Sequence, residues 1–285
     1  MDLDEEAIAL HKKLKGKITT SLRGDVTPET LKLFYSPGVG AASKYAQKDN
    51  RKLREVSWTN NLVAVISDGS AVLGLGDLGP QGAMPVMEGK SMLFKHFANI
   101  DSVPTVLDVH SVEEIVATVK AIAPSFGGIN LEDIAAPKCF EIEERLKAEL
   151  DIPVMHDDQH GTAIVVLAAL INAAIVTRRN VSDLKIVLVG AGAAGVAIAK
   201  LINHYSQARI IAVDSRGIIS KSRDDLNTEK KLLLDFTNVD NIDGSLEDAL
   251  HNADTFIGVS KAGLLTADMI KLMDKNPIVF GLANP

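Results

Sequence analysis

A glycine-rich segment, Gly190-Ala-Gly192-Ala-Ala-Gly195, follows the apolar run Lys185–Val189, which is typical of a buried strand, and precedes an apolar stretch that indicates a helix. Glycines at these three positions permit a tight turn, close approach of the backbone to a pyrophosphate, and packing of the helix on the strand. The helix N-terminus after this loop would present free N–H groups to an anion, and Ala193 and Ala194 of the loop are expected to contact the cofactor. The spacing predicts a dinucleotide site, although glycine turns also occur for packing alone.

An acidic residue, Asp214, ends the next predicted strand, Arg209–Asp214. In dinucleotide-binding folds an acid at this place accepts hydrogen bonds from the adenosine ribose and favours NAD. Arg216 and Arg223 follow it, and a nearby arginine can instead accept the 2′-phosphate of NADP. We therefore expect NAD as the cofactor, with NADP as the alternative.

Two pairs of adjacent carboxylates follow short predicted strands: Glu132-Asp133 comes after Gly128–Leu131, and Asp157-Asp158 comes after Ile152–Met155. The carboxyl ends of strands line the ligand crevice of open α/β sheets. Three carboxylate oxygens gathered there would suit Mg²⁺ or Mn²⁺. Separate solvated acids or helix caps explain the same residues equally well at this point.

Other chemistry-bearing residues are less specific by themselves. Lys90 and Tyr35 are of types usually found at the surface or in packing, but a lysine can act as a base once its pKa falls, and a tyrosine as an acid beside a cation. His156 and His160 are four residues apart, as in helical zinc sites. The segment lacks a glutamate directly after the first histidine, and Gly161 argues against a helix there, so zinc hydrolysis is disfavoured.

Alternating strands and helices are expected to position these residues, and this alternation implies parallel sheets and an α/β fold. We place the boundary near residues 155–162, which gives an N-terminal domain at 1–160 and a nucleotide-binding domain at 161–285. Strands are expected at 61–67, 71–74, 104–108, 128–131, 152–155, 185–189, 209–214, 255–259 and 277–281, and helices at 1–24, from Pro28 after the N-cap Thr27, and at 85–98, 111–122, 139–150, 162–176 and 196–205.

The composition excludes several classes of protein. The 285 residues are 46% hydrophobic and 24% charged, which is ordinary for a soluble enzyme. A net charge of −7 makes nucleic acid a poor partner. The single cysteine, Cys139, permits no disulfide within the chain. The acidic N-terminus is unlike a secretory signal, and the apolar stretches fall short of the ~18 residues of a membrane span, so we expect a cytoplasmic protein.

Taken together, these segments resemble the malic enzyme family in its shorter bacterial form. The matching segments occur in the family's order and extend over most of the chain. They are Tyr35-Ser-Pro-Gly-Val-Gly, Ser67-Asp-Gly-Ser-Ala-Val-Leu-Gly-Leu-Gly-Asp-Leu-Gly, Pro85-Val-Met-Glu-Gly-Lys90, Asn130-Leu-Glu-Asp, His156-Asp-Asp-Gln-His-Gly-Thr, Val189-Gly-Ala-Gly-Ala-Ala-Gly and Phe280-Gly-Leu-Ala-Asn284-Pro.

The resemblance implies a smaller N-terminal α/β domain followed by a Rossmann-type NAD(P) domain, assembled as a homodimer or a higher oligomer. Family members continue beyond the point where this chain stops, so the resemblance also implies that the nucleotide domain lacks its final elements. The roles implied are Tyr35 as general acid, Lys90 as general base, Asp157 as the partner of that lysine, Glu132, Asp133 and Asp158 as metal ligands, and Asn284 as a substrate or nicotinamide contact.

The implied reaction is the metal-dependent oxidative decarboxylation of malate to pyruvate and CO₂ with reduction of NAD(P). Malolactic enzymes and soluble oxaloacetate decarboxylases carry nearly the same motifs and remain alternatives. An amino-acid dehydrogenase would not need the two carboxylate pairs. From another class, a catalytically silent nucleotide-binding or regulatory module is also open. Metal dependence would separate an enzyme from such a module, and the product would separate the three decarboxylating enzymes.

Overall fold

The computed structural model describes residues 3–14 and 16–283, and its contacts divide the chain into two units. The first unit is Met1–Val72, Asp77–Ile134 and Ile142–Met155, and the second is Leu73–Gly76, Ala135–Glu141 and His156–Pro285. Each unit is built on a sheet of its own. The prediction of an α/β fold is therefore confirmed.

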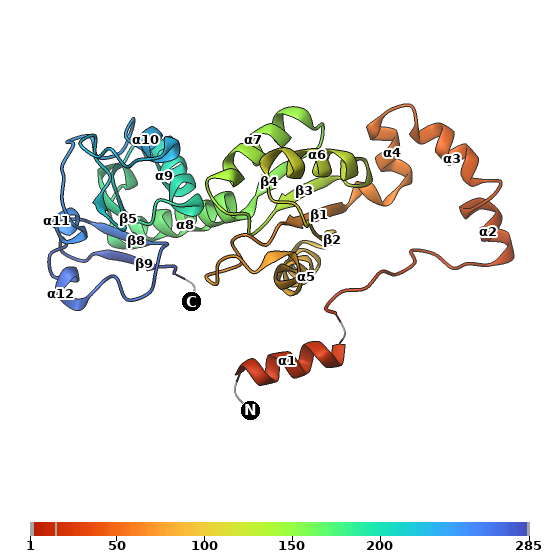
Figure 1. The fold of residues 1–285 in the computed structure, drawn as a ribbon, viewed down its shortest axis with the longest axis horizontal. Coiled ribbons are helices and arrows are strands. Elements are labelled where there is room, and N and C mark those ends of the chain that lie inside the picture. The colour runs from red at the N-terminus through yellow and green to blue at the C-terminus, as the bar shows by residue number, and fades with distance from the viewer. Residues whose placement is uncertain (1–2, 15, 284–285) are drawn as a thin grey trace. The chain divides into compact units, whose positions relative to one another are not determined.

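The first unit contains a four-stranded sheet in the order β2-β1-β3-β4, and β1 pairs in parallel with both β2 and β3. Helix α5 lies on one face of this sheet, and α6 and α7 lie on the other (Figure 1). The bounds are β1 (Leu62–Ser67), α5 (Gly79–Ala98), β2 (Asp101–Val106), α6 (Val112–Ile122), β3 (Gly128–Leu131), α7 (Lys138–Glu149) and β4 (Val154–His156). Since β1 leads to β2 on one side and has β3 on the other, the sheet has a topological switch point between β1 and β3.

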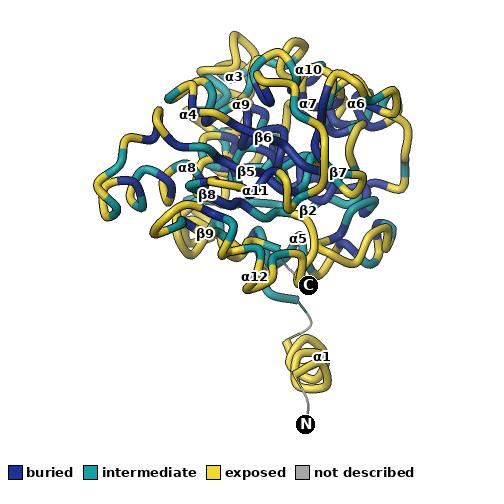
Figure 2. The backbone as a smooth tube through the Cα atoms, turned by 90° about the vertical axis from the view of Figure 1, so that its left-hand side faces the viewer, coloured by how far each residue is buried: buried dark blue, intermediate teal, exposed yellow. Residues whose placement is uncertain are grey.

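The N-terminal helices precede this sheet and are α1 (Leu3–Leu14), α2 (Pro28–Phe34), α3 (Val39–Ala46) and α4 (Asn50–Val56). None of them contains a buried residue, and α1 is exposed along its whole length (Figure 2). The predicted start of α2 is confirmed, because Thr27 caps it in a capping box with Thr30 and Pro28 is its first residue. The single helix expected over residues 1–24 is wrong beyond Leu14, since residues 16–24 are irregular.

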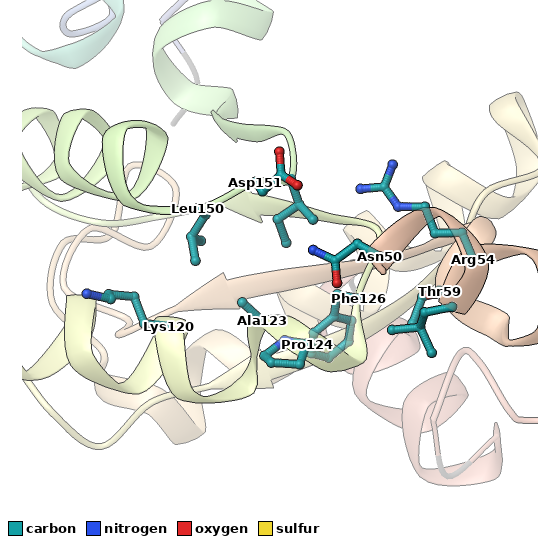
Figure 3. Close-up of a pocket in the computed structure, with 11 residues that line it drawn as sticks. Asn50, Arg54, Thr59, Lys120, Ala123, Pro124, Phe126, Leu150 and Asp151 are labelled. Atoms are coloured by element: carbon teal, nitrogen blue, oxygen red, sulfur yellow. The ribbon is translucent and has the colours of Figure 1, made fainter. Parts of the chain in front are cut away.

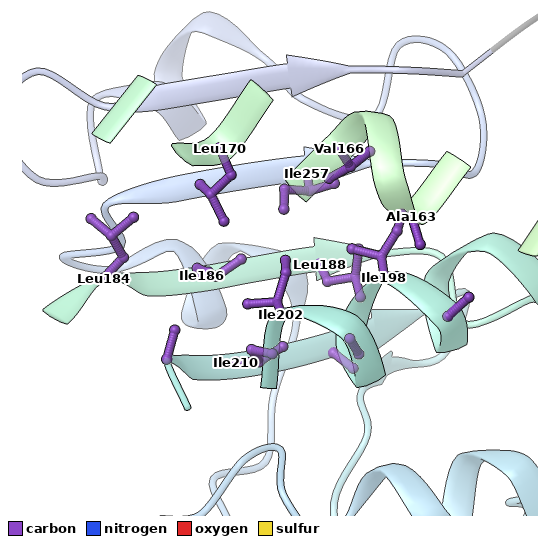
Figure 4. Close-up of a cluster of buried hydrophobic side chains, with 14 of the residues drawn as sticks. Ala163, Val166, Leu170, Leu184, Ile186, Leu188, Ile198, Ile202, Ile210 and Ile257 are labelled. Atoms are coloured by element: carbon purple, nitrogen blue, oxygen red, sulfur yellow. The ribbon is translucent and has the colours of Figure 1, made fainter. Parts of the chain in front are cut away.

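The second unit contains a five-stranded sheet in the order β7-β6-β5-β8-β9, parallel except for the β6–β7 pair. Its strands alternate between two cores. Ile186 and Leu188 of β5 pack with α8 and α9 (Figure 4), whereas Val187 and Val189 pack with α11 and α12 on the opposite face. The bounds are α8 (Asp157–Thr177), β5 (Lys185–Val189), α9 (Ala193–Ser206), β6 (Arg209–Asp214), β7 (Gly217–Ile218), α10 (Thr228–Leu233), α11 (Leu246–Leu250), β8 (Thr255–Gly258), α12 (Ala267–Ile270) and β9 (Ile278–Gly281).

Helix α8 is longer than its sequence suggests. It begins at Asp157, not at Thr162, so the expectation that Gly161 keeps this segment out of a helix is wrong. Two acidic residues in the first turn favour a helix N-terminus. A Cβ on Gly161 would lie 2.3 Å from Asp157 Oδ1, so the glycine makes room for that carboxylate within the helix.

By length and composition, α8 could also span a membrane, so the expectation that no stretch reaches that length is wrong. About 22% of its most apolar window is buried. A single such helix is weak evidence for a membrane segment, because helices that pack on a core meet the same criterion. Here Ala163, Val166, Leu170 and Ala174 belong to the core that α8 shares with β5 and α9 (Figure 4).

Two further expectations, for the segment between β1 and α5 and for the start of α5, differ from the structure. Residues 71–74 form turns around Val72 and not a strand, and Leu73 has a φ of 50°, which is left-handed and incompatible with an extended chain. Helix α5 begins at Gly79, six residues before the predicted start at residue 85. Gly79 N donates to Gly69 O at 3.2 Å, so a tertiary contact organises this helix start.

Candidate functional site

The glycine loop of the second unit joins β5 to α9 at the middle of the sheet. Gly190 has a φ of 113°, which favours glycine, and its N–H donates to Val213 O at 2.9 Å. A Cβ on Gly195 would lie 1.7 Å from Gly190 O, so α9 packs this closely only because that residue lacks a side chain. A Cβ on Gly192 would meet nothing within 4 Å, which leaves open space beside the helix N-terminus. The loop therefore fits a pyrophosphate.

The surroundings of this loop also fit a dinucleotide. Ala193 and Ala194 begin α9, where the N–H groups lack partners within the helix. Strand β5 lies between β6 and β8, which is the switch point of the sheet and the usual place for ligands. A cavity of about 280 Å³ opens at the carboxyl ends of β5, β8 and β9. Ser260 and Lys261, which follow β8, line it. Sequence reasoning missed both residues, although their place after a strand was a usable signal.

Asp214 lies at the carboxyl end of β6, one residue after the acceptor of the Gly190 hydrogen bond. Arg223 donates to both of its carboxylate oxygens, at 2.8 and 3.0 Å, and Lys230 Nζ donates to Oδ2 at 2.6 Å. Burial raises the pKa of Asp214, but these hydrogen bonds outweigh it and lower that pKa from 3.8 to about 2. The acid is therefore held as a carboxylate within a network of cations.

In the first unit, Lys90 and Glu132 form an ion pair in which Lys90 Nζ lies 3.0 Å from Glu132 Oε1. Their side chains are only 23% and 8% exposed. Helix α5 carries the lysine beside Met87 and Ser91, two residues of its buried face. Glu132 directly follows β3, and Asn130, two residues earlier on the same face of that strand, donates from Nδ2 to Glu132 Oε2 at 2.9 Å. One carboxylate oxygen therefore meets the lysine, and an amide orients the other.

Asp133 lies beside this pair in the chain and is 4% exposed. Its φ of 53° is left-handed, and its carbonyl oxygen accepts a hydrogen bond from Ala71 N at 3.0 Å. Such a backbone is uncommon for a residue other than glycine and often occurs at functional sites. Two adjacent carboxylates buried at the carboxyl ends of β1 and β3 form an oxygen donor set of the kind that Mg²⁺ and Mn²⁺ prefer. These residues therefore fit a divalent cation.

The third acidic segment belongs to the second unit, at the start of α8. His156 is fully buried, with its Nε2 3.1 Å from Asp158 Oδ2 and its Nδ1 3.1 Å from Gln159 Nε2. The histidine thus contacts two side chains in the first turn of the helix, those of Asp158 and Gln159. Asp157 lies against Gly161, as described above. His156 precedes α8, whereas His160 lies within the helix.

Tyr35 is not joined to these clusters by any hydrogen bond of the described residues. Tyr35 follows α2 and is 70% exposed, and its hydroxyl group makes no hydrogen bond with any of the described residues. Asn284 lies outside the described residues. The structure thus brings Lys90 to Glu132 within the first unit, and it places Asp214 near the glycine loop within the second.

A separate cavity of about 150 Å³ lies in the first unit, near the amino ends of β1, β3 and β4 (Figure 3). Its walls include Asn50, Arg54, Phe126 and Asp151. Lys120 also lines it, but the lysine ammonium points away from Asn50 in Figure 3 and pairs with Glu149. The cavity is at the edge of the sheet opposite the Glu132 carboxylate, and no residue predicted for the site lines it.

Comparisons with known proteins agree over both halves of the chain. Residues 11–147 match the profile of the malic enzyme N-terminal domain, and residues 159–285 match that of the malic enzyme NAD-binding domain. A bifunctional malic/malolactic enzyme of Bacillus subtilis is 51% identical over 100% of this chain and 70% of its own length. An NAD-dependent malic enzyme of Geobacillus stearothermophilus is 49% identical, and there the chain spans 59% of the relative. A probable NADP-dependent malic enzyme of Rickettsia prowazekii is 47% identical, with 37% of its length matched.

Solved structures give the same result. The crystal structure of an NAD-dependent malic enzyme from Thermotoga maritima superposes with a TM-score of 0.93 and 48% identity, over 98% of this chain and 75% of the other. The malic enzyme of Pyrococcus horikoshii gives a TM-score of 0.95 at 42% identity, over 100% and 69% of the two chains. With both domain profiles matched and half of the residues identical to a relative of which it spans 70%, this chain belongs to the malic enzyme family.

Proposed function

We propose that the chain oxidises and decarboxylates (S)-malate to pyruvate and CO₂, with a divalent metal ion and with NAD or NADP as hydride acceptor. The observation that carries the proposal is the buried pair of Lys90 and Glu132, 3.0 Å apart at the carboxyl ends of the first sheet. A lysine beside a carboxylate that can bind a metal is a suitable base for the hydroxyl group of a 2-hydroxy acid. Because the chain spans between 37% and 70% of the first relatives named above, the activity of the whole protein is part of the proposal.

Glu132, Asp133 and Asp158 are the metal ligands in this proposal. A bound metal ion would supply polarisation of the hydroxyl oxygen and stabilisation of an enolate, and a bound nicotinamide would supply a hydride acceptor. Two observations support these ligands: Glu132 and Asp133 are buried acids, and Nε2 of the fully buried His156 lies 3.1 Å from Asp158 Oδ2. Buried carboxylates are retained where a cation or a hydrogen-bond network compensates for their charge.

Three side chains would move or hold protons. Once the ammonium group that pairs with Glu132 has lost its proton, Lys90 takes the hydroxyl proton of malate at Nζ as the hydride leaves, and Asp157 is proposed to hold the resulting ammonium. Asn130 keeps Glu132 oriented toward the lysine through the 2.9 Å hydrogen bond. After CO₂ departs, Tyr35 gives its hydroxyl proton to C3. Its 70% exposure means that a tyrosine in this role must be covered when substrate is bound.

The cofactor is proposed to bind across the glycine loop of the second unit. Gly190, Gly192 and Gly195 allow the pyrophosphate to approach the N–H groups of Ala193 and Ala194, and Asp214 marks the ribose end. The nicotinamide would then lie toward the cavity lined by Ser260 and Lys261. The role of Asn284 as a substrate or nicotinamide contact stays a prediction.

The test is an activity assay with L-malate, Mn²⁺ and either NAD or NADP, in which absorbance measures the formation of the reduced cofactor. Pyruvate, lactate and oxaloacetate are assayed at the end. We expect reduced cofactor and pyruvate in equal amounts, and no reaction after chelation of the metal. Binding of NADH, measured by its fluorescence without malate or metal, gives a second readout. Cofactor binding without turnover of malate or oxaloacetate would instead favour a silent nucleotide-binding module.

A second candidate is the malolactic reaction, in which lactate forms without net reduction of the cofactor. It is favoured by the 51% identity to the Bacillus subtilis relative, whose name joins both activities. The same assay separates the two, because lactate in excess of reduced cofactor marks the malolactic reaction. Consumption of oxaloacetate without a need for NAD would mark a soluble oxaloacetate decarboxylase.

A further inference from the structure

The carboxylate of Asp214 is already saturated with hydrogen bonds. Its Oδ1 accepts from Arg223 Nη1 at 2.8 Å and from the backbone N–H of Arg216 at 2.9 Å, and its Oδ2 accepts from Arg223 Nη2 at 3.0 Å and from Lys230 Nζ at 2.6 Å. A carboxylate offers about four lone-pair sites, so these four donors use its accepting capacity. A ribose hydroxyl could bond to Asp214 only by displacing one of them.

Arg223 cannot easily turn toward a ligand either. Besides its two bonds to Asp214, it donates from Nε to Asp225 Oδ1 at 2.8 Å and from Nη2 to Asp225 Oδ2 at 2.7 Å. Its side chain is 13% exposed, and the hydrogen bonds from Arg223 to the carboxylates of Asp225 and Asp214 raise its pKa. Both acids hold this guanidinium in place, so it contributes a fixed positive charge.

Arg216 is the exposed cation of the cluster. Its side chain is 70% exposed, and its one ion-pair partner in the described part of the chain is Asp225, with Nη1 3.0 Å from Oδ2. Its backbone is fixed, because its N–H donates to Asp214. The two acids and the three cations Arg216, Arg223 and Lys230 together carry a formal charge of +1. A guanidinium that is anchored at its base and exposed at its tip can meet a phosphate beside the ribose, provided that it gives up its carboxylate partner.

We propose that Asp225, and not Asp214, sets the preference between NAD and NADP, because it holds the Arg216 guanidinium that a 2′-phosphate would need. The inference rests on the proposed binding of a dinucleotide at the glycine loop. NAD leaves the Arg216–Asp225 pair intact. The 2′-phosphate of NADP, with a charge of about −1.5 to −2, must replace the carboxylate as the partner of Arg216 and must lie close to that carboxylate.

The test is a fluorescence titration of the full chain with NADH and with NADPH, without malate or metal. For Asp225→Asn we expect NADPH to bind at least about tenfold more tightly than to the parent, because a competing like charge is removed, while NADH binding changes by no more than about twofold. Arg216→Ala should weaken NADPH binding alone. The double variant should bind NADPH as Arg216→Ala does, because the released arginine causes the gain.

A matched control is Asp240→Asn. Asp240 also pairs with an arginine, Arg209, but at the opposite end of β6, so it tests a general effect of removing one negative charge. An equal gain in NADPH affinity in this control would overturn the inference. So would an Asp214→Asn variant that changes the NADPH to NADH ratio more than Asp225→Asn does.

If Asp225→Asn fails to fold, Arg216→Ala still tests the same ion pair, because it changes an exposed side chain. Equal effects of Arg216→Ala on both cofactors would contradict the inference. If the parent binds both cofactors and no variant alters their ratio, the inference fails and the proposed function stands. If the parent binds neither, the proposed function fails and the inference fails with it.

Discussion

Two glycines of the same loop should respond in opposite ways to one added methyl group. In Gly195→Ala the new Cβ would lie 1.7 Å from Gly190 O and 2.8 Å from Gly190 C, where ordinary contacts begin at about 3.4 Å. The obstacle is backbone, so either α9 or the end of β5 must shift. Overpacked interiors usually lose about 1–3 kcal/mol, and because the obstacle is rigid we expect a loss near 3 kcal/mol from the free energy of unfolding.

In Gly192→Ala the new Cβ meets no heavy atom within 4 Å, and the φ of −89° suits alanine. We therefore expect the free energy of unfolding to stay within about 0.5 kcal/mol of the parent. The methyl group would, however, enter the space through which the pyrophosphate approaches the backbone. NADH affinity should fall at least about tenfold, or about 1.4 kcal/mol.

The assay is urea unfolding followed by far-UV circular dichroism, with NADH titrations in parallel. The one tryptophan, Trp58, belongs to the first unit, so its fluorescence follows that unit separately. Gly195→Ala should lower the dichroism midpoint more than the Trp58 midpoint. A fully stable Gly195→Ala variant would refute the packing argument, and unchanged NADH affinity in Gly192→Ala would refute the assignment of the loop to the pyrophosphate.

Three further substitutions test the core, the proposed base and the acid network. Leu170→Ala should lower the free energy of unfolding by about 2–5 kcal/mol, because the side chain is fully buried. Ile164→Ala, on the exposed face of the same helix, should change that free energy little. Similar urea midpoints for the two variants would contradict the packing of α8. Lys90→Met should reduce turnover about 10²–10⁴-fold and leave NADH binding unchanged. The control Lys95→Met, on the same helix but paired with Asp101, should stay active. Loss of NADH binding in Lys90→Met would mean that the lysine has another role. The pKa of Asp214 is lowered to about 2 in the folded chain, so its charge stabilises the fold above about pH 4, and this contribution is lost as the pH falls from 3.8 toward 2. In urea titrations, the difference in unfolding free energy between the parent and Asp214→Asn should therefore shrink over that range. A difference that grows on acidification would contradict the ion network.

Much of the secondary structure followed from local patterns. The strand at Lys185–Val189 and the strand at Gly128–Leu131 have the predicted bounds, because short apolar runs between turn residues are typical of buried strands. Helix α6 begins after Ser111, which forms the capping box with Glu114. These signals lie within a few residues of one another, so no tertiary contact is needed to detect them.

The errors occurred where contacts or backbone geometry that residue type does not specify decide the local structure. Leu73 adopts a left-handed backbone that its apolar side chain does not predict. The start of α5 depends on the hydrogen bond from Gly79 to Gly69 across a loop. At the start of α8, Gly161 indicated a break, but the glycine instead accommodates the Asp157 carboxylate within the helix. In each case the residue type alone permitted two structures.

The sequence by itself determined the α/β class, the glycine loop, the family, and the side chains that carry the proposed chemistry, because these depend on residue type, spacing and order. Only the tertiary structure decided how those side chains are used. The 3.0 Å contact of Lys90 with Glu132 depends on how α5 packs on the first sheet. Arg223 and Lys230 reach Asp214 from 9 and 16 residues away, because the turn after β6 and helix α10 bring them back to it. Chain order does not specify such contacts, since they form only when separate elements pack together.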